Sequence, residues 1–119
     1  MSDVLLWVGV GLLGGCGAIA RFLVDGFVST RVGTAFPLGT FVVNLSGATI
    51  LGLLTGLALS GNQLLLAGTA VIGSYTTFST WLFETHRLAE DDQRLLLALN
   101  LLLSVIAGVL ACALGRAIG

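Results

Sequence analysis

The fold is decided by residues 32–83, which read VGTAFPLGTFVVNLSGATILGLLTGLALSGNQLLLAGTAVIGSYTTFSTWLF and contain no charged side chain. As one helix this stretch would be about 78 Å long, whereas the hydrocarbon core of a membrane is about 30 Å thick. The stretch therefore has to cross a membrane twice and turn back. Its polar cluster at residues 60–63 (SGNQ) predicts the turn.

Two further charge-free stretches flank this segment. Residues 4–20 and 95–115 are each close to the length of about 20 apolar residues that one membrane-spanning helix needs. The sequence therefore predicts an all-α integral membrane protein with one domain over residues 1–119. We expect four transmembrane helices, at approximately 4–25, 39–59, 64–84 and 95–115.

The composition excludes several other classes of protein. Charged residues make up 9% of the 119 residues, hydrophobic residues make up 56%, and there are 17 glycines. A soluble core of this size cannot bury so much apolar surface, because small domains have a large surface for their volume. Disordered chains and nucleic-acid-binding proteins both need more charge. The sequence therefore predicts no nucleic-acid partner and contact with membrane lipid.

The arginines predict the orientation in the membrane. With four spans, the side that holds both termini carries one arginine, Arg116. The opposite side carries four: Arg21, Arg31, Arg87 and Arg94. If Arg21 lies within the membrane, the count is three to one. Because positively charged loops stay in the cytoplasm, this count predicts that both termini lie outside the cell.

Uncharged polar side chains inside the predicted spans indicate a transport path. A lone serine or threonine can hydrogen-bond to its own helix, whereas an asparagine amide has two donor hydrogens and an acceptor to satisfy. Asn44 and Asn100 are therefore the stronger candidates. Asn100, Ser104 and Gly108 follow at four-residue spacing on one helix face, which predicts either one wall of a polar track or a set of interhelical hydrogen bonds.

The third predicted span contains an unfavourable helix sequence. Residues 73–81 (GSYTTFSTW) combine glycine with β-branched, hydroxyl and aromatic residues, which are poor helix formers. A helix interrupted inside the membrane frees backbone carbonyls, and these can coordinate a cation where they are shielded from lipid. Phe78 and Trp81 share a face of this segment, as Phe41 and Asn44 do in the second span.

Two glycine pairs have the GxxxG spacing that lets membrane helices approach closely. They are Gly11 with Gly15 in the first span and Gly52 with Gly56 in the second. We expect both pairs to support tight helix packing, within a subunit or between subunits. The sequence contains no set of nucleophile, base and orienting residue and no phosphate-binding loop, so it predicts no enzyme.

Three motifs resemble those of the CrcB/Fluc family of fluoride channels. They are residues 14–22 (GGCGAIARF), 39–44 (GTFVVN) and 76–80 (TTFST), the last followed by Glu84. The motifs occur in the order of the first three spans. Together with the length and the four-span layout, the resemblance covers the whole chain.

The resemblance implies a fluoride-selective channel of the cell membrane that gives passive fluoride efflux and lowers cytoplasmic fluoride. Members of that family assemble as inverted (antiparallel) dimers with two pores and a structural Na⁺ at the dimer interface. The resemblance implies that backbone carbonyls of Gly73 and Thr76 hold the sodium and that Arg21 lies at the vestibule. The expected pore residues are Asn44, Phe78, Trp81, Ser79, Thr80, Phe41, Asn100 and Ser104.

The residue chemistry is compatible with an anion path. Asparagine amides and serine or threonine hydroxyls are neutral donors, and aromatic ring edges carry partial positive charge. Such groups can replace the water around fluoride without a fixed positive charge that would hold the ion too tightly to release it. A sodium ion suits a cage of carbonyl oxygens and would supply the positive charge instead.

The chain departs from the family pattern at Trp81, where a second phenylalanine is expected. The bulk of Trp81 would narrow one half of the pore, or its indole N–H would donate to the anion. Together with the uneven arginine count, this residue raises the hypothesis that the chain pairs with an oppositely oriented paralogue instead of with itself.

Two other functions compete with the channel. A small four-span exporter would need a carboxylate inside the first span, and none lies between Asp3 and Asp25. A non-conducting assembly subunit would need no run of hydroxyl residues such as 76–80. The sequence therefore favours the channel.

Overall fold

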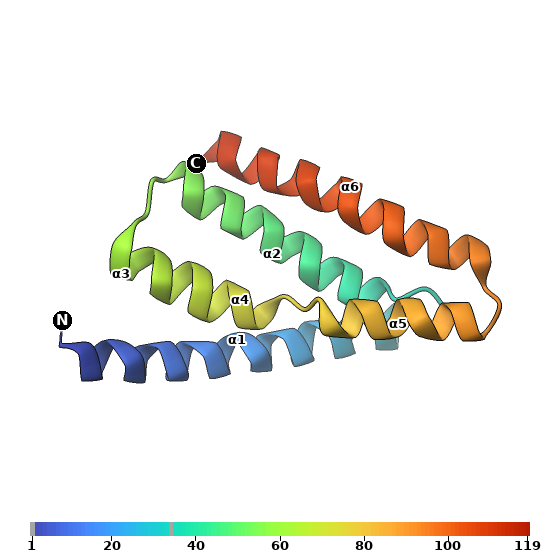
Figure 1. Ribbon diagram of the computed structural model, residues 1–119, viewed down its shortest axis with the longest axis horizontal. Helices are drawn as coiled ribbons and strands as arrows, with labels where there is room; N and C mark the ends of the chain where they lie inside the picture. Colours follow the sequence, from blue (N-terminus) through green and yellow to red (C-terminus); the bar gives the residue numbers. More distant parts are fainter. Residues whose placement is uncertain (1, 34) are drawn as a thin grey trace.

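The computed structural model describes residues 2–33 and 35–119, and within these ranges it is helical with no strand. The chain runs along the long axis of the molecule four times (Figure 1). The first, second and fourth crossings are single helices: α1 (Asp3–Val32), α2 (Leu38–Gly56) and α6 (Arg94–Ile118). The third crossing is built from four pieces: α3 (Gly61–Leu64), the π-helix η1 (Leu65–Ile72), α4 (Gly73–Tyr75) and α5 (Ser79–Glu90).

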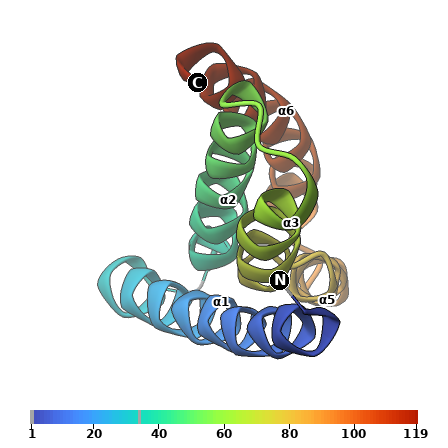
Figure 2. The ribbon, with the colours of Figure 1, turned by 90° about the vertical axis from the view of Figure 1, so that its left-hand side faces the viewer.

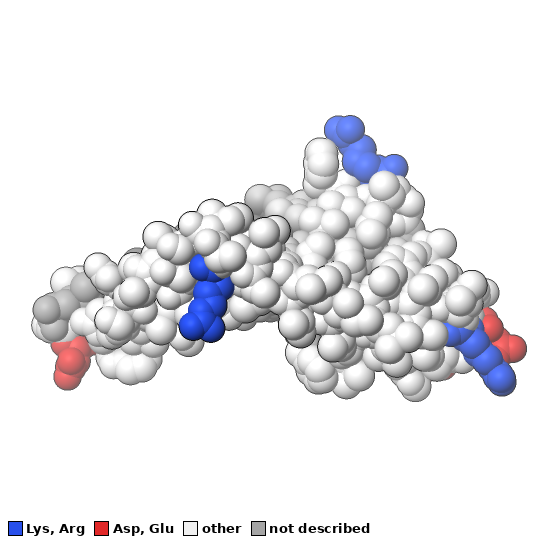
Figure 3. All heavy atoms as spheres, turned by 90° about the horizontal axis from the view of Figure 1, so that it is seen from above, with Lys and Arg blue, Asp and Glu red and all other residues white. Residues whose placement is uncertain are grey.

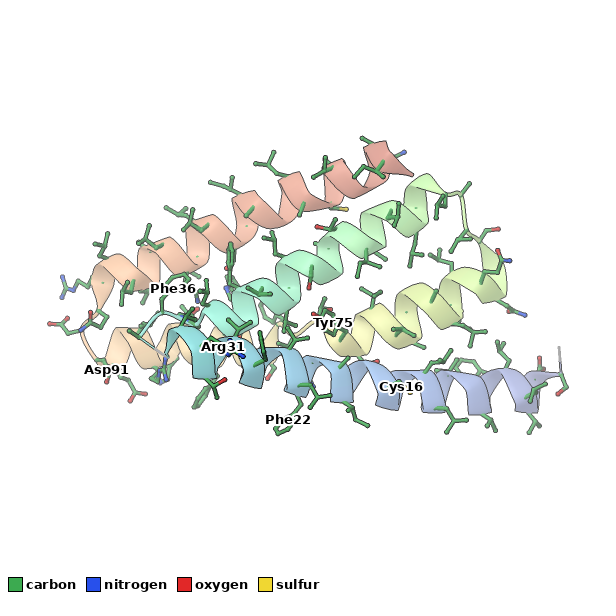
Figure 4. All side chains as sticks on the ribbon, turned by 180° about the vertical axis from the view of Figure 1, so that it is seen from behind. Cys16, Phe22, Arg31, Phe36, Tyr75 and Asp91 are labelled. Atoms are coloured by element: carbon green, nitrogen blue, oxygen red, sulfur yellow. The ribbon has the colours of Figure 1, made fainter. Side chains whose placement is uncertain are left out.

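Three of the helices, α1, α2 and α6, are long and apolar enough to cross a membrane. The molecule measures 52 × 29 × 23 Å, and many large apolar side chains lie on its outside. Phe22, for example, is 76% exposed and points away from the other helices (Figure 4). Such a surface suits lipid and not water. The prediction of an all-α multi-pass membrane protein is thus confirmed.

The first helix is longer than the expected span of 4–25. It begins after Ser2, whose hydroxyl accepts a hydrogen bond from the Leu5 N–H at 3.2 Å, and it continues to Val32. Arg31 therefore lies in the last turn of α1 and not in a loop. The helix ends at Gly33, whose φ of +83° is a left-handed conformation that glycine adopts without strain. No proline lies between Asp25 and Gly33, and the single glycine there, Gly26, does not end the helix.

The turn between the second and third crossings also differs from the expectation. Residues 57–60 form it, and Gly61 already begins the next helix. Ala58 takes a positive φ of 61° within the turn, and Ser60 is extended, as is usual for the residue before a helix. The polar residues Asn62 and Gln63 therefore belong to a helical turn.

Backbone contact at glycines holds α2 against α6, which lie side by side in two perpendicular views (Figure 1, Figure 2). A side chain at Gly52 would collide with the Cys112 carbonyl, and one at Gly115 would collide with the Thr49 carbonyl. Gly56 similarly faces the backbone of Arg116. One predicted GxxxG pair, Gly52 with Gly56, therefore packs within the chain.

The other GxxxG pair has a different environment. Nothing in the described part of the chain lies within 4 Å of where a side chain at Gly11 or Gly15 would stand. The glycine that brings α1 close to the third crossing is Gly17, where a side chain would collide with the Val71 carbonyl. The face of α1 with Gly11 and Gly15 is left open.

Charged side chains are sparse on the surface. In the view of Figure 3 they stand as isolated groups on an otherwise uncharged face. Asp91 and Phe36 lie at the same end of the molecule (Figure 4), where the turns after α1 and α5 meet, and both termini lie toward the other end (Figure 1). Arg21 lies near the middle of α1, so it does not belong clearly to either end. The arginine count of the two ends is then three to one.

Candidate functional site

The break in the third crossing is held by the side chain of Asn44 on α2. Its amide nitrogen donates to the Thr77 carbonyl at 2.8 Å, and its amide oxygen accepts from the Thr77 N–H at 2.8 Å. The amide of Asn44 thus replaces the two backbone partners that Thr77 would have in a continuous helix. Thr77 is buried, so its backbone groups need these hydrogen bonds.

Two backbone carbonyls lose their usual helical partners at the break. The Thr77 N–H, which would reach the Gly73 carbonyl in a regular helix, is bound to Asn44. The Thr80 N–H, which would reach the Thr76 carbonyl, is bound at 3.1 Å to the Thr77 hydroxyl. Within residues 2–33 and 35–119, no hydrogen bond to the oxygen of Gly73 or of Thr76 outside the helices is found. These two oxygens are therefore available to a ligand.

Gly73 and Thr76 line a groove of about 620 Å³. The walls of the groove come from α2, from the third crossing and from the aromatic residues that follow the break. Phe78 lies at its edge with 69% of its side chain exposed. An aromatic pair forms there, because the ring centroids of Phe78 and Trp81 are 5.5 Å apart.

Trp81 joins α5 to α6. Its indole N–H donates to the Ser104 hydroxyl oxygen at 3.0 Å and lies 3.4 Å from the Asn100 carbonyl oxygen. We expected Trp81 either to narrow one half of the pore by its bulk or to donate its indole N–H to the anion. In the structure the indole N–H is hydrogen-bonded within the chain itself. Ser104 also lines a small cavity of about 30 Å³ with Phe41 and Asn44.

Phe41, Asn44 and Ser104 are therefore brought together, and Leu45 and Gly108 complete the wall of this small cavity. A space of this size holds one molecule of water or an ion of similar size. Asn44 keeps one amide hydrogen that is not used by Thr77, because an amide nitrogen carries two. The cavity lining contains neutral donors, an aromatic ring and no charged side chain.

Asn100 lies elsewhere, although it shares a helix face with Ser104. Its side chain is completely buried, and its amide nitrogen donates to the Thr85 hydroxyl at 2.8 Å. The Thr85 hydroxyl in turn donates to the Trp81 carbonyl at 2.8 Å. These bonds join α5 to α6. Of the two roles predicted for Asn100, a wall of a polar track or an interhelical hydrogen bond, the structure thus shows the interhelical hydrogen bond. The Asn100 amide oxygen has no partner among the described residues.

The remaining predicted residues line two other hollows. Arg21 and Thr80 border a cavity of about 220 Å³ between α1, α2 and the break, together with Asp25 and Thr40. Ser79 borders a separate open hollow with Leu82 of α5 and Leu97 of α6. The structure thus does not bring Ser79 and Thr80 to the same place as Phe41, Asn44 and Ser104.

Two polar contacts at the site were not predicted. The Thr40 hydroxyl donates to the Glu84 carboxylate, which links α2 to α5. The Tyr75 hydroxyl lies 2.9 Å from the Ser46 hydroxyl and joins α4 to α2 (Figure 4 labels Tyr75). Thr40 and Glu84 lie in or beside motifs that were recognised, but their pairing depends on how α2 packs against α5, and sequence spacing does not specify that packing.

Comparison with known proteins gives a consistent result. The family described as CrcB-like protein, Camphor Resistance (CrcB), matches residues 8–116. The chain is 54% identical to fluoride-specific ion channel FluC 2 of Mycolicibacterium paratuberculosis, over 98% of this chain and 95% of the relative. It is 50% identical to FluC 2 of Mycobacterium tuberculosis, over 95% and 90% of the two chains. It is 41% identical to FluC 1 of Symbiobacterium thermophilum, over 95% and 96%.

Proposed function

Because the chain belongs to the CrcB family, we infer that it is a fluoride-specific ion channel of the cell membrane, as its relatives are named. It carries fluoride passively out of the cell and so lowers cytoplasmic fluoride. It is a transport protein and not an enzyme. Since the family match extends over residues 8–116, the functional assignment concerns the whole four-helix domain.

The cavity between Phe41, Asn44 and Ser104 is the observation that best supports an anion path in this chain. Fluoride loses hydration water on entering a narrow space, and donors have to replace that water. The free amide hydrogen of Asn44, the Ser104 hydroxyl and the edge of the Phe41 ring are suited to this role. None of them carries a full positive charge, so the ion can leave again.

The proposed pathway assigns the other predicted residues to its approaches. Arg21 borders the polar cavity beside Thr80 and would attract anions to a vestibule. Phe78, at the rim of the large groove, would present its ring edge to the ion. For Ser79, which is exposed and borders a different hollow, a pore role requires a second subunit over that hollow. Asn100 would contribute by holding α5 against α6.

A structural Na⁺ is part of the proposal. The carbonyl oxygens of Gly73 and Thr76, which lose their helical partners at the break, are hard oxygen ligands of the kind that sodium prefers. One chain offers two such oxygens, so a second subunit would complete the coordination. When bound, the ion would supply positive charge near the anion path.

The large groove supports an inverted dimer. Gly73 and Thr76 line this groove of about 620 Å³, which is open in the single chain. We propose that a second subunit in the opposite orientation covers it. That subunit is either another copy of this chain or an oppositely oriented paralogue, and the three-to-one arginine count favours the paralogue, because an uneven count selects one orientation.

Reconstitution tests the function. Liposomes that contain the purified chain and are loaded with fluoride and chloride should release fluoride, measured with a fluoride electrode, and retain chloride. Liposomes loaded with the same ions but without protein are the control. Equal release of both anions would contradict the proposal. If the chain alone releases neither ion but releases fluoride together with a paralogue of opposite orientation, the heterodimer is supported and the homodimer is excluded.

A further inference from the structure

The Ser104 hydroxyl does not make the hydrogen bond to its own helix that Thr49 and Thr55 make. A serine or threonine in a membrane helix usually donates to the carbonyl three or four residues earlier. Thr49 donates to Leu45 at 2.9 Å and Thr55 donates to Leu51 at 3.0 Å in this way. The corresponding acceptor for Ser104 is the Asn100 carbonyl, and no such bond from Ser104 is formed. The hydroxyl hydrogen of Ser104 is thus not used by its own helix.

Trp81 explains this difference. Its indole nitrogen approaches both the Ser104 hydroxyl oxygen, at 3.0 Å, and the Asn100 carbonyl oxygen, at 3.4 Å. An indole N–H is a donor only, so Ser104 has to accept from it. The indole N–H therefore lies beside the carbonyl to which Ser104 would otherwise donate, and it takes one lone pair of the hydroxyl. The hydroxyl hydrogen of Ser104 has no acceptor among the hydrogen bonds of the described chain.

The small cavity lies beside Ser104. Ser104 lines it together with Phe41 and Asn44, and the Asn44 amide oxygen, the one other side-chain acceptor of the lining, already accepts from the Thr77 N–H. The Ser104 hydroxyl of α6 and the second amide hydrogen of Asn44 on α2 thus both lie at the cavity, and neither hydrogen has another partner in the described chain. Two donors that face one small space, with no charged residue, form a site for a small anion.

We propose that Trp81 is a positioning residue that fixes the Ser104 hydroxyl as a hydrogen-bond donor to fluoride. The inference rests on the proposed channel function and adds to it a residue whose role a phenylalanine cannot fill. A phenylalanine at position 81 would keep the aromatic contact with Phe78 but would release the Asn100 carbonyl. The Ser104 hydroxyl would then turn back to its own helix and be lost to the anion.

The first test compares two tryptophan variants in fluoride-loaded liposomes. Trp81→Phe should lower the fluoride flux by about tenfold, which corresponds to one hydrogen bond to a charged group. Trp7→Phe is the matched control, because Trp7 is 62% exposed on α1, away from the cavity, and its flux should equal that of the wild type. Ser104→Ala should lower the flux as Trp81→Phe does, and the double variant should lose no more than either single variant. If the flux loss of the double variant equals the product of the two single losses, the two residues act independently and the inference is overturned.

A spectroscopic test reports on the hydrogen bond itself. The chain has two tryptophans, so the Trp7→Phe protein contains Trp81 as its sole tryptophan. Its emission should shift to shorter wavelength in Ser104→Ala, which lacks the acceptor, and should keep the wild-type wavelength in Thr49→Val, whose hydroxyl serves its own helix. Fluoride should change the emission and chloride should not. An emission that neither Ser104→Ala nor fluoride alters would overturn the inference.

The outcomes separate the two proposals. If wild-type liposomes release no fluoride, alone or with a paralogue, the channel function is wrong. If they release fluoride and Trp81→Phe does so at the same rate, the channel function stands and the role of Trp81 is wrong. If Trp81→Phe fails to fold, the comparison of Ser104→Thr with Ser104→Ala tests the inference instead. The threonine variant keeps the hydroxyl and should retain the fluoride flux, whereas the alanine variant should lose it. Equal flux in these two variants would overturn the inference.

Discussion

At the scale of single residues, Asn44 has the most consequences for this protein. One amide side chain ends a helix, because it takes both the N–H and the carbonyl of Thr77. The same side chain has a hydrogen left for the small cavity. Asn44 thus couples the break in the third crossing to the proposed anion path, and a change at this residue should affect stability and transport together.

Asn44→Asp tests this coupling. The carboxylate can accept from the Thr77 N–H but cannot donate to the Thr77 carbonyl. That buried carbonyl oxygen therefore loses its donor and faces a carboxylate oxygen instead. We expect a loss of about 2 kcal/mol in unfolding free energy and a lower fluoride flux. Thermal unfolding in detergent and the electrode assay measure the two effects. Asn62→Asp, on the exposed first turn of α3, is the control; equal melting temperatures for the two variants would argue against the coupling.

Phe78→Ile tests the aromatic part of the path. An aliphatic side chain has no partially positive ring edge, so we expect roughly a three- to tenfold loss of fluoride flux, while the unfolding temperature stays close to that of the wild type. Phe83→Ile is a matched control, because Phe83 has a similar exposed fraction, 66% against 69%, and borders a different hollow on α5. If the two variants lose flux equally, the ring of Phe78 has no special role.

At the scale of the elements, glycine contacts decide which helices pack together. Sequence spacing predicted two GxxxG faces of equal quality, yet Gly52 and Gly56 meet the backbone of α6 and Gly11 and Gly15 meet nothing in the described chain. The pattern identifies a helix face that permits close approach, but it does not identify the partner. The partner glycine, Gly115, lies outside both predicted pairs.

Gly115→Ala tests this contact. The added methyl group would collide with the Thr49 carbonyl, so α2 and α6 would have to separate, and we expect a loss of about 1–3 kcal/mol in unfolding free energy. At Gly26, also within a helix, a side chain would meet open space. Gly26→Ala should therefore leave stability unchanged or raise it by about 0.5–1 kcal/mol. Thermal unfolding of both variants in the same detergent distinguishes a packing effect from a general effect of alanine.

Helix boundaries were predicted less well than the number of spans. The count of four followed from charge-free lengths, because the membrane thickness sets how many residues one crossing needs. The ends depend on local backbone geometry, as at Gly33 and Ala58, and on capping bonds such as that from the Thr80 N–H to Thr77. These features are not set by hydropathy, so α1 extends to Val32 instead of ending near residue 25.

At the scale of the whole molecule, the arginines are distributed unevenly between its two ends. The turns after α1 and α5 lie at one end with Arg31, Arg87 and Arg94, and Arg116 lies at the end with both termini. Arg21 borders the polar cavity and is part of the proposed vestibule instead of a loop. A three-to-one count still predicts that the end with the two turns faces the cytoplasm.

Cysteine labelling tests this orientation. In a background in which Cys16 and Cys112 are replaced by alanine, Asn62→Cys and Asp92→Cys place single thiols at opposite ends of the molecule. In intact cells that express the chain alone, a membrane-impermeant thiol reagent should label Asn62→Cys and leave Asp92→Cys unlabelled until the cells are opened. Equal labelling of the two variants would show that the chain inserts in both orientations and so can form an inverted dimer with itself.

By itself, the sequence determined the class of protein, the four crossings, the interruption of the third crossing and the resemblance to fluoride channels. These properties follow from local quantities: charge, the length of apolar stretches, helix propensity and motif order. Only the tertiary structure decided which polar groups meet. It pairs Asn44 with Thr77 and Trp81 with Ser104, and it turns Asn100 toward Thr85 although Asn100 and Ser104 share a helix face. Such pairings depend on how separate helices are rotated and spaced against one another, and no spacing within one helix contains that information.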